Sequence, residues 1–160
     1  MTDHTRPTAV AALDVAPHPV QSTYPEPFFS QMQGREKRRL GDVFGLANFG
    51  VNLTRMAPGS MSALRHSHTK QDEFVYILAG CATLITDAGE TELVAGMCAG
   101  FKAGSGDAHQ LINRGETEVL YLEVGDRIPG DGVDYPDVDL AAVLGEDQKW
   151  RFARKDGTSY

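Results

Sequence analysis

Short runs of alternating apolar and polar residues, separated by glycine-rich turns, dominate the middle of the chain. In FGVNLTRM, Val51 and Leu53 alternate with polar residues, and EFVYILAG is rich in β-branched and aromatic residues and ends at Gly80. A period of two residues is typical of half-buried strands. Further strands are predicted in SALRHSH, HQLIN and EVLYLEVG, and a hairpin in CATLITDAGETELVAG. Short strands at regular spacing predict an all-β sandwich or barrel.

The two ends of the chain have a different pattern. Residues 1–30 are rich in proline, threonine and alanine, which predicts an arm that is extended or partly disordered, with YPEPFF as its anchor. Residues 31–160 are expected to form the barrel domain, with its core at about 51–126 and a covering tail at 127–160. In the tail, Asp139 is a candidate N-cap for a short helical segment, and KWRFARKDG predicts a strand or extended segment at an edge.

Composition narrows the range of partners. The chain has 160 residues and a formal net charge of -7, which suits one globular domain and argues against nucleic acid as a ligand. The one basic run, REKRR at Arg35 to Arg39, is short and is expected at a solvated edge or surface turn. No secretory leader or bilayer-spanning run is evident, so a cytoplasmic protein with no membrane partner is expected.

Three side chains on two adjacent predicted strands point to metal chemistry. His66 and His68 are two residues apart on a strand and therefore project from the same face. Glu73 opens the next strand, where its alternates Val75 and Ile77 are apolar, so its carboxylate is expected to face inward with them. A buried carboxylate is costly unless it is paired or bound to a cation. A divalent metal would satisfy all three side chains.

A fourth ligand is expected from His109, which begins a later strand. Of the five histidines in the chain, the remaining two, His4 and His18, lie in the N-terminal arm. The alternative is a set of surface histidines beside a strand, and the added glutamate and strand histidine favour the metal site.

These residues also carry a family resemblance. The chain resembles the cupin superfamily, whose first motif is a glycine, five residues, His-x-His, three or four residues, Glu, six residues and Gly. Here the motif runs Gly59, His66, His68, Glu73 and Gly80, with six residues rather than five after the first glycine.

The second cupin motif is recognisable but altered. Gly96 is followed by MCAGF, and Lys102 stands where proline is usual. Four residues, SGDA, rather than two separate Gly104 from His109, and Asn113 closes the motif at the usual distance. The similarity is strongest to small single-domain cupins loosely labelled sugar-phosphate-isomerase-like.

The resemblance implies a double-stranded β-helix, or jelly-roll, barrel with one divalent manganese, iron, nickel or zinc ion at His66, His68, Glu73 and His109. Four protein ligands leave coordination positions open, which suits catalysis or ligand capture. One hypothesis is therefore a metal-dependent isomerase, lyase or dioxygenase for a small oxygenated, anionic molecule such as a sugar phosphate or a keto or hydroxy acid. The other is a non-catalytic ligand-binding or sensing module.

Further predictions concern residues around the barrel and the assembly of the chain. Arg55 continues the alternation of Val51 and Leu53, so it is either an inward ligand for an anionic substrate or a solvent-facing cation. Tyr76 is expected on the outer face, Lys102 and Gln110 in solvent, and Asn113 in a hydrogen-bonding role. Single-domain cupins commonly pair through sheet edges, so the resemblance also implies a homodimer.

Overall fold

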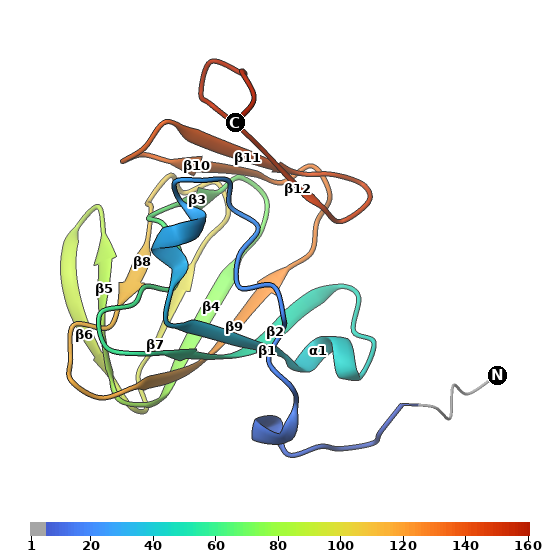
Figure 1. Cartoon of the computed structure of the whole chain (residues 1–160), viewed down its shortest axis with the longest axis vertical. Coiled ribbons are helices and arrows are strands. Elements are labelled where there is room, and N and C mark those ends of the chain that lie inside the picture. Colours follow the sequence, from blue (N-terminus) through green and yellow to red (C-terminus); the bar gives the residue numbers. More distant parts are fainter. Residues whose placement is uncertain (1–5) are drawn as a thin grey trace.

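The computed structural model describes residues 6–160, which form an all-β structure of three sheets (Figure 1). This confirms the predicted all-β, jelly-roll class. The strands are β1 (Arg35–Arg39), β2 (Phe49–Met56), β3 (Ser67–His68), β4 (Glu73–Ala79), β5 (Cys81–Thr86), β6 (Gly89–Val94), β7 (Cys98–Phe101), β8 (Gln110–Ile112), β9 (Val119–Asp126), β10 (Gly132–Tyr135), β11 (Leu140–Leu144) and β12 (Trp150–Ala153). The helical elements in the described residues are η1 (Ala12–Asp14), η2 (Phe29–Met32) and α1 (Leu40–Val43).

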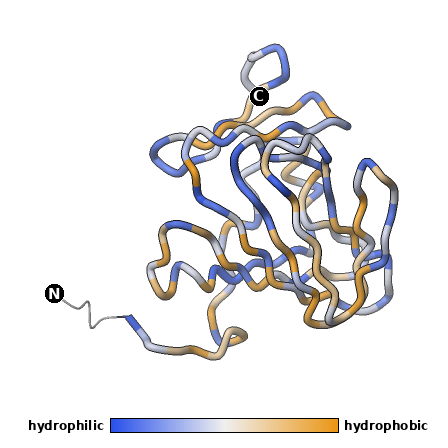
Figure 2. The backbone as a smooth tube through the Cα atoms, turned by 180° about the vertical axis from the view of Figure 1, so that it is seen from behind, coloured by the Kyte–Doolittle hydropathy of each residue, from blue (hydrophilic) through white to orange (hydrophobic). Residues whose placement is uncertain are grey.

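The largest sheet has the strand order β1-β2-β9-β4-β7, and all its pairs are antiparallel. A second sheet has the order β12-β11-β10-β3 and a third β6-β5-β8. Hydrophobic and hydrophilic positions alternate along many of these strands (Figure 2). This alternation gives the five-stranded sheet one face toward the barrel interior and one face outward.

Two apolar clusters hold the sheets together. One joins the five-stranded sheet to the sheet β6-β5-β8, and the other packs against the sheet β12-β11-β10-β3, called the C-terminal sheet below. The first joins β2, β4, β5, β6, β8 and β9 through Met56, Val75, Ile77, Ala82, Leu84, Leu93, Leu111, Val119 and Tyr121. The second includes Phe28, Met32, Leu64, Val133, Tyr135, Leu140 and Ala142. The candidate site contacts both clusters. His109 stacks on Phe101, which packs against the first cluster, and His66 stacks on Tyr135 of the second.

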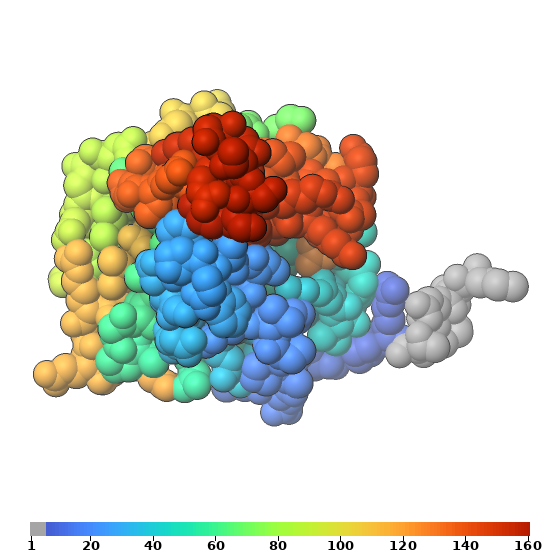
Figure 3. All heavy atoms as spheres, turned by 45° about the horizontal axis from the view of Figure 1, so that its top comes forward, coloured from blue at the N-terminus to red at the C-terminus, as the bar shows by residue number. Residues whose placement is uncertain are grey.

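The part of the N-terminal arm from Tyr24 onward packs against the C-terminal sheet, and the two lie side by side at one end of the barrel (Figures 1 and 3). Phe28 is buried there, as an anchor in YPEPFF requires, and its ring meets Tyr160 edge-on. Tyr24 makes edge contacts with Tyr135 and Phe152, at centroid distances of 5.7 and 5.5 Å. Residues 1–5 of the predicted arm lie outside the described residues.

The tail contains a strand where a helix was expected. The apolar run after Asp139 forms β11, in which buried and more exposed residues alternate. It pairs with β10 on one side and β12 on the other. Asp139 does not cap a helix, and its Oδ1 accepts a hydrogen bond from the Lys155 amide at 2.9 Å. Pairing with two neighbouring strands has overridden the helical preference of leucine and alanine.

The basic run REKRR forms strand β1, an edge of the five-stranded sheet, so its place at an edge agrees with the prediction. This edge is less solvated than expected. Arg35 is only 8% exposed, and the three residues after it are half-buried, whereas charge runs usually lie on solvated faces.

Candidate metal centre

His66 and His68 project from a segment with little regular strand structure. Only Ser67–His68 forms strand β3, which pairs with β10, whereas SALRHSH was expected to form a longer strand. His66 is held by a backbone bridge to His109, through N–H to O distances of 3.1 and 2.8 Å. This bridge places two of the predicted ligands directly opposite each other.

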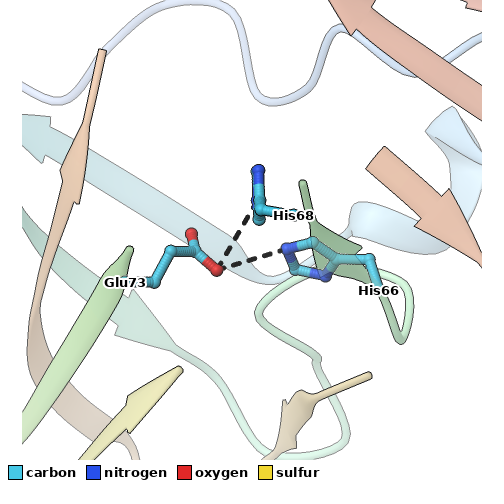
Figure 4. A group of neighbouring side chains, drawn as sticks. All are labelled: His66, His68 and Glu73. Carbon is cyan, nitrogen blue, oxygen red and sulfur yellow. Dashed lines mark ion pairs between the residues drawn. The ribbon is translucent and has the colours of Figure 1, made fainter. Parts of the chain in front are cut away.

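The histidines converge on one carboxylate oxygen of Glu73, at the start of β4 (Figure 4). The Nε2 atoms of His66 and His68 lie 3.5 and 3.6 Å from Glu73 Oε2. One ligand atom from each of the three residues lies within 4.8 Å of the other two. The three side chains are therefore close enough to bind a single ion.

The second ring nitrogen fixes the orientation of the ring in both His66 and His68. His66 Nδ1 lies 2.7 Å from the carbonyl oxygen of Leu64, and His68 Nδ1 lies 2.5 Å from Asp131 Oδ2. Both partners are acceptors, so Nδ1 carries a proton in each ring, and Nε2 is the nitrogen that could give a lone pair to a metal ion. Metal-binding histidines commonly use this arrangement.

Asp131 is a supporting residue that sequence reasoning missed. It is fully buried, and besides His68 it accepts hydrogen bonds from the amides of Lys70 and Gln71, at 2.7 and 3.3 Å, and from Thr69 Oγ1 at 3.2 Å. One carboxylate thus fixes both the imidazole of His68 and the turn that leads to Glu73. Only the pairing of β3 with β10 brings it near the site, and no local motif marks it.

His109 lies against the same carboxylate from the opposite side. Its Nε2 is 2.8 Å from Glu73 Oε2, and its ring stacks on Phe101 with centroids 3.5 Å apart. Burial is the main cause that lowers the pKa of His109, and it outweighs the raising effect of Glu73. Its imidazole is therefore neutral at pH 7, which is the form that binds metals.

Two buried polar atoms of the cluster have no hydrogen-bond partner within the described residues. Glu73 Oε2 is buried and makes no hydrogen bond of acceptable geometry within the described residues, and His109 Nδ1 is also unpartnered. Burial alone raises the pKa of the Glu73 carboxyl, but the surrounding imidazoles outweigh it and hold the pKa well below its usual range. A carboxylate kept ionised with an unsatisfied oxygen facing imidazole nitrogens fits a bound cation.

The cluster opens into a cavity of about 1040 Å³. Aromatic residues of the C-terminal sheet, Tyr135, Trp150 and Phe152, line it together with Tyr24 from the arm. The five-stranded sheet contributes polar residues, and Gly125 lies beside Glu73 in the register of β9 with β4. Because a glycine has no side chain, space is left next to the carboxylate.

The alternation in β2 predicted that Val51, Leu53 and Arg55 share the inward face, and this was wrong. Asn52 lines the cavity, and Asn52, Thr54 and Met56 pair in turn with Glu123, Tyr121 and Val119 of β9. Helix α1 packs against β2, so apolar residues are buried on its outer face as well. Apolar character alone therefore did not reveal which face was inward.

Arg55 consequently lies away from the cluster. It forms ion pairs with Glu118 and, at 3.4 Å, with Glu36, and its side chain is 42% exposed. It is not part of the cavity lining.

Other sequence predictions have mixed outcomes. Tyr76 faces outward and Lys102 is exposed, as expected. Gln110, expected in solvent, is half-buried and donates to the Ala63 carbonyl at 2.7 Å. Asn113 is a hydrogen-bonding residue, with Nδ2 donating to the carbonyls of Met56 and Thr117 at 3.0 and 2.8 Å.

The altered loop before His109 lies beside the histidines. The amide of Gly104 donates to the carbonyl of His68 at 2.8 Å, whereas residues 104–107 are exposed. The insertion is therefore accommodated at the surface, and Ala108 and His109 return to the buried interior.

In residues 6–160, no helix is long and apolar enough to span a lipid bilayer.

Comparison with known proteins places this geometry in a family. A family model described as the cupin domain matches residues 52–125. No curated protein matches the chain significantly.

Among solved structures, a sugar phosphate isomerase from a cupin superfamily, from Silicibacter pomeroyi DSS-3, is similar. It has 39% identity and a TM-score of 0.89 over 95% of this chain and 96% of that chain. A protein from Acidithiobacillus ferrooxidans, provisionally described as a sugar phosphate isomerase, has 28% identity and a TM-score of 0.71, over 79% and 80% of the two chains.

A polyketide cyclase from Streptomyces resistomycificus shares the fold, with 19% identity and a TM-score of 0.60 over 74% and 78% of the two chains. The cupin-domain match and the similarity along nearly the whole of the Silicibacter protein agree with the barrel fold. The chain belongs to the cupin superfamily.

Proposed function

We propose that this protein is a metal-dependent enzyme that acts on a small oxygenated, anionic molecule, with His66, His68, Glu73 and His109 as the metal ligands. The observation that carries the proposal is the buried, unsatisfied Glu73 Oε2, on which three imidazole Nε2 atoms converge at the wall of a large cavity. A structural ion would be enclosed by its ligands, whereas this cluster borders open space.

Three nitrogen donors and one carboxylate oxygen suit manganese, iron, nickel or zinc. A bound ion of this kind would act as a Lewis acid on an oxygen atom of the ligand. The protein supplies the orientation, because Asp131 and the Leu64 carbonyl hold two imidazole rings and Phe101 supports a third. The aromatic residues Tyr24, Tyr135 and Trp150 would exclude water from one side of a bound molecule.

The relative with 39% identity is named as a sugar phosphate isomerase. This supports sugar phosphates, together with keto and hydroxy acids of similar size, as the first compounds to test. Isomerisation is the first reaction to test, with lyase and dioxygenase chemistry as the other arms of the assay.

Metal content and affinity test the proposal directly. We expect the purified protein to contain about one divalent ion per chain and, after chelation, to rebind one of manganese, iron, nickel or zinc with a saturable isotherm. Glu73→Gln and His68→Gln should each weaken binding by about 10-fold or more, because a ligand is lost. The control is Arg55→Gln, which removes a charge outside the cavity and should leave the isotherm unchanged. Absence of metal binding by the wild type would exclude the proposal.

Turnover then separates an enzyme from a binding module. Conversion of any compound in the panel by the metal-loaded protein, lost in Glu73→Gln, supports an enzyme. Saturable ligand binding with no conversion across the panel would instead support the non-catalytic alternative.

A further inference from the structure

Strand β1 turns three cationic side chains toward the cavity. Arg35, Lys37 and Arg39 all line it. The intervening Glu36 and Arg38 lie on the opposite face and contact each other. The most basic segment of an acidic chain therefore directs three of its four cations toward the cavity.

Lys37 is fixed in place by a polar network on the cavity wall. Its Nζ lies 2.5 Å from Glu123 Oε1, which also accepts from Asn52 Nδ2 at 2.9 Å, and Tyr121 OH lies 3.2 Å from Glu123 Oε2. The side chains of Lys37 and Glu123 nevertheless remain 31% and 21% exposed. Because both line the cavity, a molecule inside it could contact the ammonium group without displacing the pair.

Arg35 forms no ion pair with a carboxylate within the described residues. One terminal nitrogen donates to the Ser62 carbonyl, and the other donates to the Gln21 carbonyl at 2.6 Å. The side chain is more than nine-tenths buried, and its Nε is buried without a hydrogen-bond partner. A buried guanidinium with only neutral partners is costly unless an anion approaches it.

These groups leave the inner wall with an excess of positive charge. Arg35 and Lys37 oppose the one carboxylate of Glu123. The next carboxylate in electrostatic range, Glu73, belongs to the histidine cluster, where a bound cation would offset its charge. Burial is the main cause that lowers the pKa of Lys37, and repulsion from Arg35 adds to it, against the raising effect of Glu123. An incoming anion would relieve this repulsion.

The cationic wall lies close to the histidine cluster. On β9, Gly125 pairs with Glu73, and Glu123 is two residues away on the same face, about 7 Å along the strand. Lys37 and Glu73 line the same cavity, and the charge of Glu73 acts to raise the pKa of Lys37. A small molecule could therefore contact both regions at once.

We propose that Arg35 and Lys37, positioned by Glu123, form an anion subsite that binds the carboxylate or phosphate group of the molecule whose other oxygens meet the histidine cluster. This inference rests on the proposed function, since it assigns the second contact of the same ligand. It also explains why a chain with a net charge of -7 directs cations into its cavity.

Calorimetric titration of the full chain with inorganic phosphate and with malonate tests this subsite. The titrations are done on the purified protein and again after chelation, so that binding to a metal is separated from binding to the cationic wall. We expect one anion per chain in both states, and the tighter of the two anions identifies the ligand class. Lys37→Gln should weaken this binding by about tenfold or more, since a charge-assisted hydrogen bond is lost.

Arg38→Gln is the matched control, because it removes the same charge from the next residue of β1 on the outer face. It should change the affinity by less than about twofold, because Arg38 is not part of the cavity lining. If Lys37→Gln does not fold, the double variant Lys37→Gln/Glu123→Gln removes both members of the pair and should show the same loss of anion binding.

Two results would overturn the subsite: no anion binding by the chelated wild type, or equal weakening by Lys37→Gln and Arg38→Gln. Metal titration of the same samples distinguishes this failure from failure of the proposed function. Lys37→Gln should retain the metal affinity of the wild type. If the wild type binds no metal but binds anions through Lys37, the metal proposal falls and the subsite is supported.

Discussion

Asp131 acts on the candidate site although it is 63 residues from His68 in the sequence. Asp131→Asn is a minimal change, because the amide oxygen can still accept from the Lys70 and Gln71 amides. Its NH₂ group, however, would face His68 Nδ1 and favour the tautomer with the proton on Nε2, which leaves no lone pair on the nitrogen that faces the cluster. We predict a metal affinity about 10- to 100-fold weaker, measured by competition with a chromogenic chelator.

The exposed Asp134 on β10 provides the control for this prediction. Asp134→Asn removes a carboxylate from the same strand region and should bind metal as the wild type does. Wild-type affinity in Asp131→Asn would show that the contact with His68 does not select its tautomer.

At the scale of single residues, the sequence predicted the side chains that share a strand or begin the next one. His66, His68 and Glu73 could be recognised because strand parity and a short turn bring them together. Asp131 could not be recognised, since its place depends on the pairing of β3 with β10. Lys37 was misread because its charge suggested solvent, whereas the cavity supplies a carboxylate partner inside the barrel.

At the scale of elements, the turn between β4 and β5 depends on Gly80. Its φ is +82°, and a Cβ there would lie 2.4 Å from the Glu118 carbonyl oxygen. Gly80→Ala therefore combines backbone strain with a clash against backbone, and we predict a loss of about 2–4 kcal/mol in the free energy of unfolding. Urea denaturation followed by circular dichroism measures it.

Gly89, the first residue of β6, allows backbone strain to be measured without a clash. Its φ is +121°, but a Cβ there would meet nothing within 4 Å. Gly89→Ala should cost about 1–2 kcal/mol from strain alone. Equal losses in the two variants would contradict the close approach at Gly80.

Element prediction succeeded where one face of a strand is buried and the other is not. The alternation in β4 gave the correct inward face, with Val75 and Ile77 buried and Phe74 and Tyr76 exposed. In β2 both faces are covered, so the same rule chose the wrong face. For β11, a short apolar run is compatible with helix or strand, and only its neighbours decided between them.

At the scale of the whole molecule, the outer face of β4 is a candidate dimer surface. Phe74, Tyr76 and Leu78 are 42%, 37% and 42% exposed on this one face. Adjacent exposed apolar side chains of this size are unfavourable in a monomer, which supports the homodimer expected from the family resemblance. We predict a mass of twice the chain in light scattering and a monomer for Phe74→Lys/Leu78→Lys.

The metal isotherm of that double variant provides the control, because the substituted side chains point away from Glu73 and its cluster. Unchanged metal binding would show that the barrel is intact. A wild-type protein that scatters as a monomer at all concentrations tested would exclude the dimer.

The alternation of charge along β1 has a consequence for how the cavity could change. In the observed register, positions 35, 37 and 39 present three cations to the interior. A slip of one residue would present Glu36 and Arg38 instead, so the contribution of the strand would fall from three positive charges to zero. Because β1 is an edge strand preceded by the turn at Gly34, an insertion or deletion in this turn is a short mutational route from anion binding to the binding of neutral ligands.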